Sequence, residues 1–287
     1  SYNKNMGVMK NSNRDVLNGT VTLTYRVDNF SFSSQTSIGN TDANNETVAF
    51  SRFSQMNPFY EKRTADGQVP KYVYNSSLTG IVYNPLWDFY QNSFNKSNAH
   101  SVTENLQVEW RILPQLRLRG NFQYNLNKTV AEVFVSPNET SEVKKEELKK
   151  GSYRNSSTNT HSYNGRLNLT YGANFDSHTI NVAAGMQFSE NNNKAYAFNV
   201  EGYQNDKFWN PNFSNGYPEG GRPTSTDTKS RSASYYANIN YAYDMRYLLD
   251  FNYTTNGASQ FGINDPFTTT WSVGLGWNLH SEPFMKD

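Results

Sequence analysis

The side chains that most often carry catalysis are sparse and scattered in this sequence. No two histidines have the spacing of metal ligands, and there is no cysteine to act as a nucleophile. The sequence also lacks the Gly-x-Ser-x-Gly turn of serine hydrolases and the Gly-x-x-x-x-Gly-Lys-Ser/Thr loop that binds phosphates. The histidines are His100, His161, His178 and His280. We therefore expect no enzymatic activity.

Aromatic side chains gather in two segments that lack strand patterning. Aromatic faces can stack on sugar rings, so these residues are candidates for a glycan-binding surface. The alternatives are that they pack the loops together or contact a partner protein. The candidates are Trp87, Phe89 and Tyr90 in one segment and Phe208, Trp209, Phe213 and Tyr217 in the other.

Charged side chains also fall on the polar faces of expected strands. If those faces line a wet interior, the charges can pair with one another, contact another domain or contact a substrate, and we favour the structural roles. They are Glu109, Arg117, Arg119, Arg166 and Asp250. Calcium could use the oxygen ligands of Asp42, Asn44, Asn45 and Glu46, but their spacing matches no EF-hand loop. A solvated loop is the preferred interpretation, and no cofactor is expected.

These candidates depend on strands in which apolar and polar residues alternate. The clearest case is 232–279, where three alternating runs follow one another and the first places Tyr235, Ala237 and Ile239 at every second position. Period-two alternation predicts β-strands with one apolar and one polar face. Nine strands are expected, at about 16–27, 30–38, 102–112, 116–126, 163–173, 179–189, 232–243, 247–253 and 271–279.

Composition agrees with strands that cross a membrane. Mean hydropathy is −0.80 although 15% of residues are aromatic, a mixture that argues against disorder and fits a thin apolar belt diluted by polar residues. No run approaches the roughly 20 apolar residues that a membrane helix needs. The net charge of +1 indicates no global field for nucleic acid or an acidic substrate. The absence of cysteine fits an oxidising compartment, although it is also common in cytosolic proteins.

The expected connections alternate in length. Short turns are expected at 28–29, 113–115, 174–177, 244–245 and 280–283, and long loops at 39–100, 127–160, 190–229 and 256–269. Short turns at one end and long loops at the other are typical of outer-membrane barrels. The charged run 142–150 is expected to form a solvated helix within its loop. Because nine is an odd number and an open sheet leaves edges unpaired in lipid, we expect one part of a larger barrel.

Seven different short motifs follow one another along the chain. They lie at residues 5–12, 25–32, 57–60, 84–87, 247–253, 256–262 and 271–277. Their order and spacing resemble the mid-barrel region of SusC/RagA-type TonB-dependent outer-membrane transporters. Residues 256–262 read Asn-Gly-Ala-Ser-Gln-Phe-Gly where that family usually has Asp-Gly-Ser-Ser-Arg-Phe-Gly. The two changes remove an acidic and a basic group, so no salt bridge is expected at that motif in this chain.

The resemblance implies a plugged barrel of about 22 antiparallel strands in the bacterial outer membrane. It implies short periplasmic turns, long extracellular loops and contact with the TonB complex through a plug region that is not identified here. A SusD-type surface lipoprotein would close over the top. The cargo would be an oligosaccharide, or a peptide in some members. Residues 1–287 are then one partial barrel domain that contacts membrane lipid and no nucleic acid.

Two other functions stay open at the level of sequence. One is a passive porin-like or adhesion barrel without energy coupling. The other is a soluble secreted β-protein that binds glycans, which would have to expose a large apolar face to water.

Overall fold

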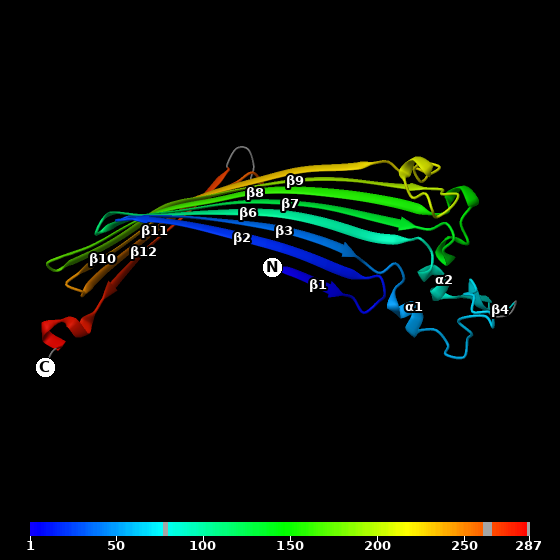
Figure 1. The fold of residues 1–287 in the computed structure, drawn as a ribbon. Helices are drawn as coiled ribbons and strands as arrows, with labels where there is room; N and C mark the ends of the chain where they lie inside the picture. Colours follow the sequence, from blue (N-terminus) through cyan, green and yellow to red (C-terminus); the bar gives the residue numbers. More distant parts are fainter. Residues whose placement is uncertain (77–79, 261–265, 286–287) are drawn as a thin grey trace.

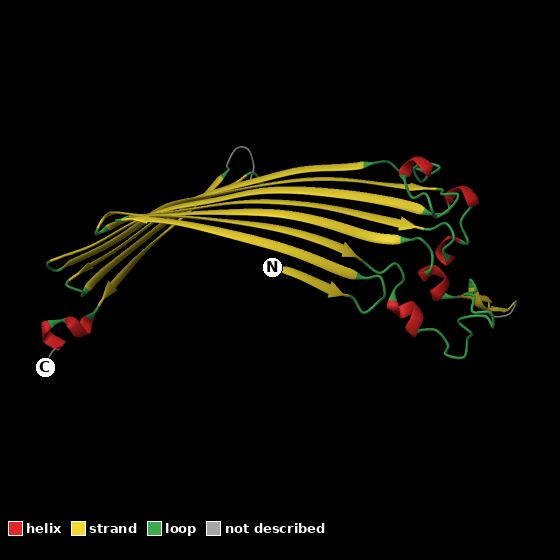
Figure 2. Ribbon diagram, in the orientation of Figure 1, coloured by secondary structure: helices red, strands yellow, loops and turns green. Residues whose placement is uncertain are grey.

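The computed structural model describes residues 1–76, 80–260 and 266–285. One antiparallel sheet of ten strands dominates it, and the sheet is curved and twisted along its length (Figures 1 and 2). Its strands lie side by side in chain order. They are β1 (Tyr2–Met6), β2 (Asn13–Val27), β3 (Phe30–Asn44), β6 (Phe94–Leu113), β7 (Leu116–Val135), β8 (Ser152–Phe175), β9 (His178–Glu201), β10 (Thr224–Tyr243), β11 (Tyr247–Ala258) and β12 (Phe267–Trp277).

All nine expected strands are present, but their count and lengths needed correction. The tenth strand, β1, pairs with the start of β2 and was missed because its five residues show no apolar alternation. Strands β8 and β9 contain 24 residues each and extend well beyond the alternating segments. The loop-side half of β8 is polar on both faces over residues 154–162, so hydrophobic periodicity does not reveal it. In β9 the polar run 190–194 interrupts the alternation before Tyr196, Phe198 and Val200. Three of the four expected long loops therefore shrink to residues 45–93, 136–151 and 202–223, named below the first, second and third loops. The fourth, expected at 256–269, falls between the end of β11 at Ala258 and the start of β12 at Phe267, and residues 261–265 lie outside the described residues.

The short turns lie together at one end of the sheet (Figure 1). Asp28, Asp176 and Asp244 adopt positive φ angles of 45°, 50° and 50° there, a conformation that aspartate tolerates better than most residues. The expected turns near 28, 114, 176 and 244 are thus confirmed. The expected simple turn at 280–283 is wrong, because η4 (Leu279–Ser281) and η5 (Pro283–Met285) form short 3₁₀ helices there.

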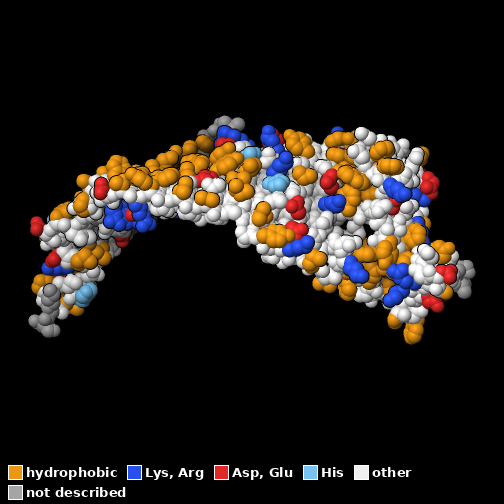
Figure 3. All heavy atoms as spheres, in the orientation of Figure 1, with side chains coloured by type: hydrophobic (Ala, Val, Ile, Leu, Met, Phe, Trp, Pro, Cys, Tyr) orange, Lys and Arg blue, Asp and Glu red, His pale blue; other side chains and the backbone are white. Residues whose placement is uncertain are grey.

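The two faces of the sheet differ in chemistry. On one face Trp110, Leu118 and Leu169 lie opposite one another on β6, β7 and β8. This apolar face is uncovered, with Leu275 83% and Trp271 70% exposed. Figure 3 shows hydrophobic side chains gathered along the convex side over the half that carries the short turns. An antiparallel sheet with a bare apolar outer face is the wall of a membrane barrel rather than one layer of a soluble sandwich.

The loops fold at the opposite end. They contain α1 (Phe50–Ser54), the hairpin of β4 (Tyr72–Ser76) and β5 (Gly80–Tyr83), α2 (Pro85–Phe89), η1 (Thr140–Glu142), η2 (Glu147–Lys149) and η3 (Pro211–Phe213). A small core of Phe134, Tyr153, Val200 and Tyr203 lies beneath them. No helix among the described residues is long and apolar enough to cross a membrane.

Candidate functional site

The polar face of the sheet, called the polar wall below, carries the expected charged residues. Glu109 on β6 lies opposite Arg119 on β7, with 3.1 Å between a carboxylate oxygen and Nε of Arg119. The Nε atoms of Arg117 and Arg111 lie 3.6 and 3.9 Å from the other oxygen. Three guanidinium groups therefore surround one carboxylate.

The other two charged residues of the polar wall pair with amides. Arg166 donates to the side-chain oxygen of Gln187 at 2.9 Å. Asp250 accepts a hydrogen bond from the side-chain amide of Asn240. A groove across this face is lined mainly by neutral polar side chains, including Gln35, Asn105, Gln107, Asn121, Gln123 and Asn164. The wall is thus a hydrogen-bonding surface with charge concentrated at Glu109 and the arginines around it.

The aromatic residues of the first loop are held by polar contacts. The indole nitrogen of Trp87 donates to the carbonyl oxygen of Asn138 at 3.0 Å. Arg63 donates to the Tyr90 hydroxyl at 2.9 Å, and its guanidinium also lies 5.6 Å from the centre of that ring. Phe89 and Tyr90 meet edge to face at 5.5 Å. These rings are therefore fixed in place, and Tyr90 remains exposed.

The aromatic residues of the third loop divide into two groups. Trp209 packs on Phe94 and Tyr153, with ring centres 5.4 and 5.9 Å apart. By strand register those two rings belong to the apolar face, so Trp209 covers the loop-end core rather than the polar wall. Phe208, Phe213 and Tyr217 are about half exposed, and Phe208 contacts Phe213. No ring contact joins this set to the first-loop set within the described ranges.

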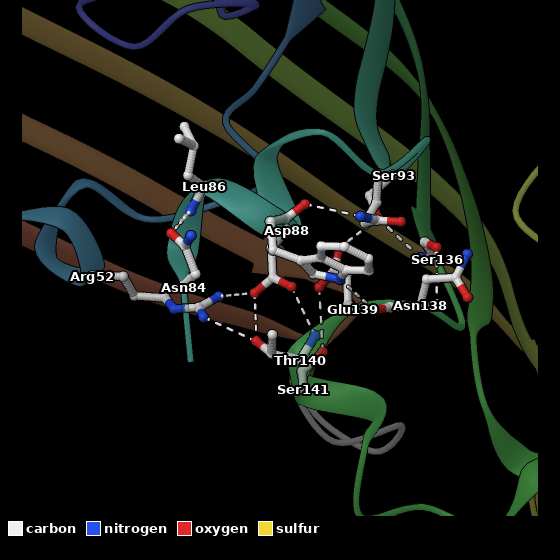
Figure 4. A network of polar contacts seen from close by, with 12 residues as sticks. Arg52, Asn84, Leu86, Asp88, Ser93, Ser136, Asn138, Glu139, Thr140 and Ser141 are labelled. Atoms are coloured by element: carbon white, nitrogen blue, oxygen red, sulfur yellow. Dashed lines mark hydrogen bonds and ion pairs between the residues drawn. The ribbon is translucent and has the colours of Figure 1, made fainter. Parts of the chain in front are cut away.

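A buried polar network that sequence reasoning missed lies between the first and second loops (Figure 4). Asp88 is fully buried and accepts from Arg52 at 2.6 Å and from the backbone N–H and hydroxyl of Thr140 at 2.7 and 2.5 Å. Asn84 caps α2 by accepting from the N–H of Leu86 at 3.1 Å. The Asn-Pro pair that begins α2 was the only sequence signal, and it indicates a helix start without indicating the distant partner.

A second part of the network is centred on Glu139. Its carboxylate accepts from Ser93 and, at 3.2 Å, from Ser141. The Ser93 hydroxyl in turn accepts from the N–H of Ser136 at 2.9 Å. Burial is the main cause that raises the pKa of Glu139, because desolvation penalises the charged form. Together with Asp88, these contacts fix the backbone on both sides of Trp87 and Asn138.

Two loop predictions needed correction. The charged run 142–150 is not a solvated helix throughout: Glu142 is buried, and it accepts from the N–H of Gly151 at 3.0 Å and pairs with Lys145 at 2.8 Å. Asp42 and Asn44, considered as calcium ligands but expected in a solvated loop, lie on strand β3 instead, and Asp42 accepts from Asn40 and Asn98. No cluster of three or more His, Cys, Asp or Glu side chains suited to a metal ion occurs in the part of the chain that the structure describes.

The chain resembles TonB-dependent receptors in parts of its sequence and in its fold. No family model matches the chain. It is 27% identical over 139 residues to TonB-dependent receptor P3 of Formosa agariphila, covering 47% of this chain and 13% of that receptor. It is 34% identical over 64 residues to TonB-dependent receptor SusC of Bacteroides thetaiotaomicron, covering 22% of this chain and 6% of SusC. The solved RagAB peptide transporter aligns over 96% of this chain and 31% of that one with a TM-score of 0.71 at 16% identity, which shows a shared fold.

The chain is similar to SusC/RagA-type TonB-dependent receptors in parts of its sequence and to RagAB in its fold. The strand order of the sheet agrees with the fold that it shares with RagAB. The part of the chain that aligns with the curated relative P3 spans about an eighth of the length of that receptor. Residues 261–262 of the family-like motif at 256–262 lie outside the described residues.

Proposed function

We propose that residues 1–287 are part of the barrel domain of an outer-membrane importer driven through TonB. The single observation that supports this most strongly is the sheet itself, with an uncovered apolar face on one side and a hydrogen-bonding polar wall on the other. The relatives named as TonB-dependent receptors support the energy coupling. In this proposal the short turns face the periplasm and the folded loops face the cell exterior.

The proposed cargo is an oligosaccharide. Exposed rings at Tyr90, Phe208, Phe213 and Tyr217 offer stacking faces at the loop end. Asn and Gln side chains along the polar wall can exchange hydrogen bonds with sugar hydroxyls as the cargo passes. Peptide cargo is the alternative within the family, since RagAB is titled a peptide transporter.

The proposed partners are a SusD-type lipoprotein above the loops and the TonB complex below the barrel. Buried contacts tie the first loop to the second, and an exposed hydrogen bond from the N–H of Asn92 to Asp206 at 3.3 Å ties the first loop to the third. These contacts give a lid protein a defined surface. Covalent chemistry has no role in this mechanism: cargo binds at the loops, and passage along the wall follows rearrangement of a plug.

Uptake by the full-length receptor that contains this chain tests the proposal. Cells that express it are expected to remove oligosaccharides from the medium, and deletion of either the receptor gene or tonB should abolish removal. Uptake that persists without TonB would instead support a passive barrel. Recovery of the receptor as a monodisperse protein without detergent would contradict a membrane role altogether.

A further inference from the structure

The polar wall carries more arginines than carboxylates and so has a net positive charge, although the whole chain has a net charge of only +1. Strand register places a set of arginines there, and the lysines of the same strands lie on the opposite face. The arginines are Arg14, Arg26, Arg111, Arg117, Arg119, Arg154 and Arg166. The carboxylates that share their face on the described strands are Glu109, Asp250 and, at the loop-side end of β9, Glu201.

The densest part of this charge is the arginine cluster, which we define as Arg111, Arg117 and Arg119 around Glu109. All three arginines approach the carboxylate through Nε, at 3.1 to 3.9 Å. Glu109 can neutralise only one of them, so the cluster retains an excess of two positive charges.

The outer nitrogens of the cluster remain available. Among the described residues, no side-chain hydrogen bond uses the Nη atoms of these arginines, and their side chains are 39% to 61% exposed. A guanidinium group presents several donors in one plane, a geometry that matches carboxylate and sulfate oxygens. The cluster is therefore an open set of donors for an anionic group.

Two further arginines on the polar wall add to the positive charge around the cluster. Across the same face, Arg26 lies in the cross-strand row of Glu109 through Ser31, and Arg166 lies beside Asn121 on the neighbouring strand. The groove further along the wall is lined mainly by neutral amides and hydroxyls. A wall with an excess of one sign of charge raises the local concentration of oppositely charged solutes.

We propose that the arginine cluster is a station for anionic oligosaccharides, which carry carboxylate or sulfate groups, as they pass along the polar wall. This inference rests on the proposed import function and narrows its substrate class. The cluster lies towards the short-turn end of β6 and β7, beyond the exposed loop aromatics, so cargo meets it after leaving the loops. Sugar rings would be recognised first and acidic groups afterwards.

One variant that removes positive charge from the cluster and another that removes negative charge test the proposal against a purely structural role. R117Q/R119Q in the full-length receptor removes two donors, whereas E109Q removes the competing carboxylate. If the ion pairs only hold the strands together, both variants lose uptake alike. If the cluster binds anions, the first weakens and the second strengthens capture of acidic cargo. R231Q is the matched control, because Arg231 is similarly exposed and paired to Glu190 at 2.6 Å but lies on the other face.

The uptake measurement supplies cells with a mixed pool of neutral and uronate- or sulfate-bearing oligosaccharides and follows depletion of each by mass spectrometry. We expect preferential depletion of acidic species, a roughly tenfold slower rate in R117Q/R119Q, and a faster rate in E109Q. Neutral species and R231Q should change by less than about twofold. Depletion of neutral species alone would overturn the anion proposal while leaving the import function intact.

A binding measurement separates the two proposals if no oligosaccharide is taken up. Crystals of the purified full-length receptor are soaked in selenate, and anomalous scattering locates the anion. A peak between Arg117 and Arg119 that disappears in R117Q/R119Q and persists in E109Q supports an anion site even where import fails. A carboxylate of the receptor's own lumenal domain at that place, or no peak, would overturn it.

Discussion

Asp88 is the residue on which the loop end most depends. It is fully buried, and it accepts hydrogen bonds from the guanidinium of Arg52 and from the backbone N–H and the hydroxyl of Thr140. Such a network fixes loops only when every member is paired, because an unpaired polar group in a dry site is costly. The buried carboxylate of Asp88 therefore holds the neighbouring aromatic residue Trp87 in position.

We predict that Asp88→Ala loosens the first and second loops by about 2–3 kcal/mol, because Thr140 and Arg52 lose their buried partner. Hydrogen exchange of the amides in residues 84–93 and 138–142 of the full-length receptor measures this directly. Asp66→Ala, in an exposed part of the same loop, is the control and should leave exchange unchanged. Equal protection in both variants would contradict the role of the network.

The raised pKa of Glu139 predicts that the stability of the second loop depends on pH. Burial raises its pKa, so the folded loop binds a proton more tightly than the unfolded loop does. Its contribution to loop stability is then fully present below the ordinary carboxyl pKa and is lost as pH rises through the raised value. Hydrogen exchange, corrected for intrinsic rates, should show the second loop opening more readily as pH increases across that window. In Glu139→Gln the slope should disappear, and an unchanged slope would assign the effect to another group.

The strands show how far sequence reasoning reaches. Where one face is apolar, alternation located nine of the ten strands of the main sheet and four of the short turns, because a slip of one residue would move the apolar side chains to the polar face. The loop-side halves escaped it, since Ser156, Thr158 and Thr160 are as polar as their neighbours on the other face. The buried network escaped too, because residues 88 and 140 are brought together only by the folded loops.

Close packing on the apolar face gives a prediction about strand β8. A Cβ atom on Gly165 would lie 2.1 Å from the ring of Phe188 on β9, so the ring occupies the space above the glycine. Gly165→Ala should therefore destabilise the barrel by roughly 1–3 kcal/mol. Gly19→Ala is the matched control, because a Cβ there meets nothing within 4 Å and alanine weakens a strand less than glycine does. Thermal unfolding of the receptor in detergent compares them, and equal midpoints would show that Phe188 moves aside freely.

The ten-stranded sheet forms a wall with one apolar face and one polar face. β1 and β12 each have one edge without a partner among the described residues, so the sheet closes only with further strands. In the proposed importer, the apolar face contacts lipid, the polar wall lines the path of the cargo, and the loops position aromatic rings at the entrance. The expected odd number of strands was wrong, yet the physical argument behind it holds for ten strands as well, since ten in an open sheet still leave two edges.

The measurement that tests this account most directly uses the absence of cysteine from the chain. Single cysteines at Leu169 and Thr170, adjacent residues on opposite faces of β8, are spin-labelled in the full-length receptor in lipid vesicles. The account predicts that the label at 169 collides mainly with oxygen dissolved in lipid and the label at 170 mainly with a water-soluble nickel complex. Equal access of both labels to the nickel complex would contradict a membrane-spanning wall.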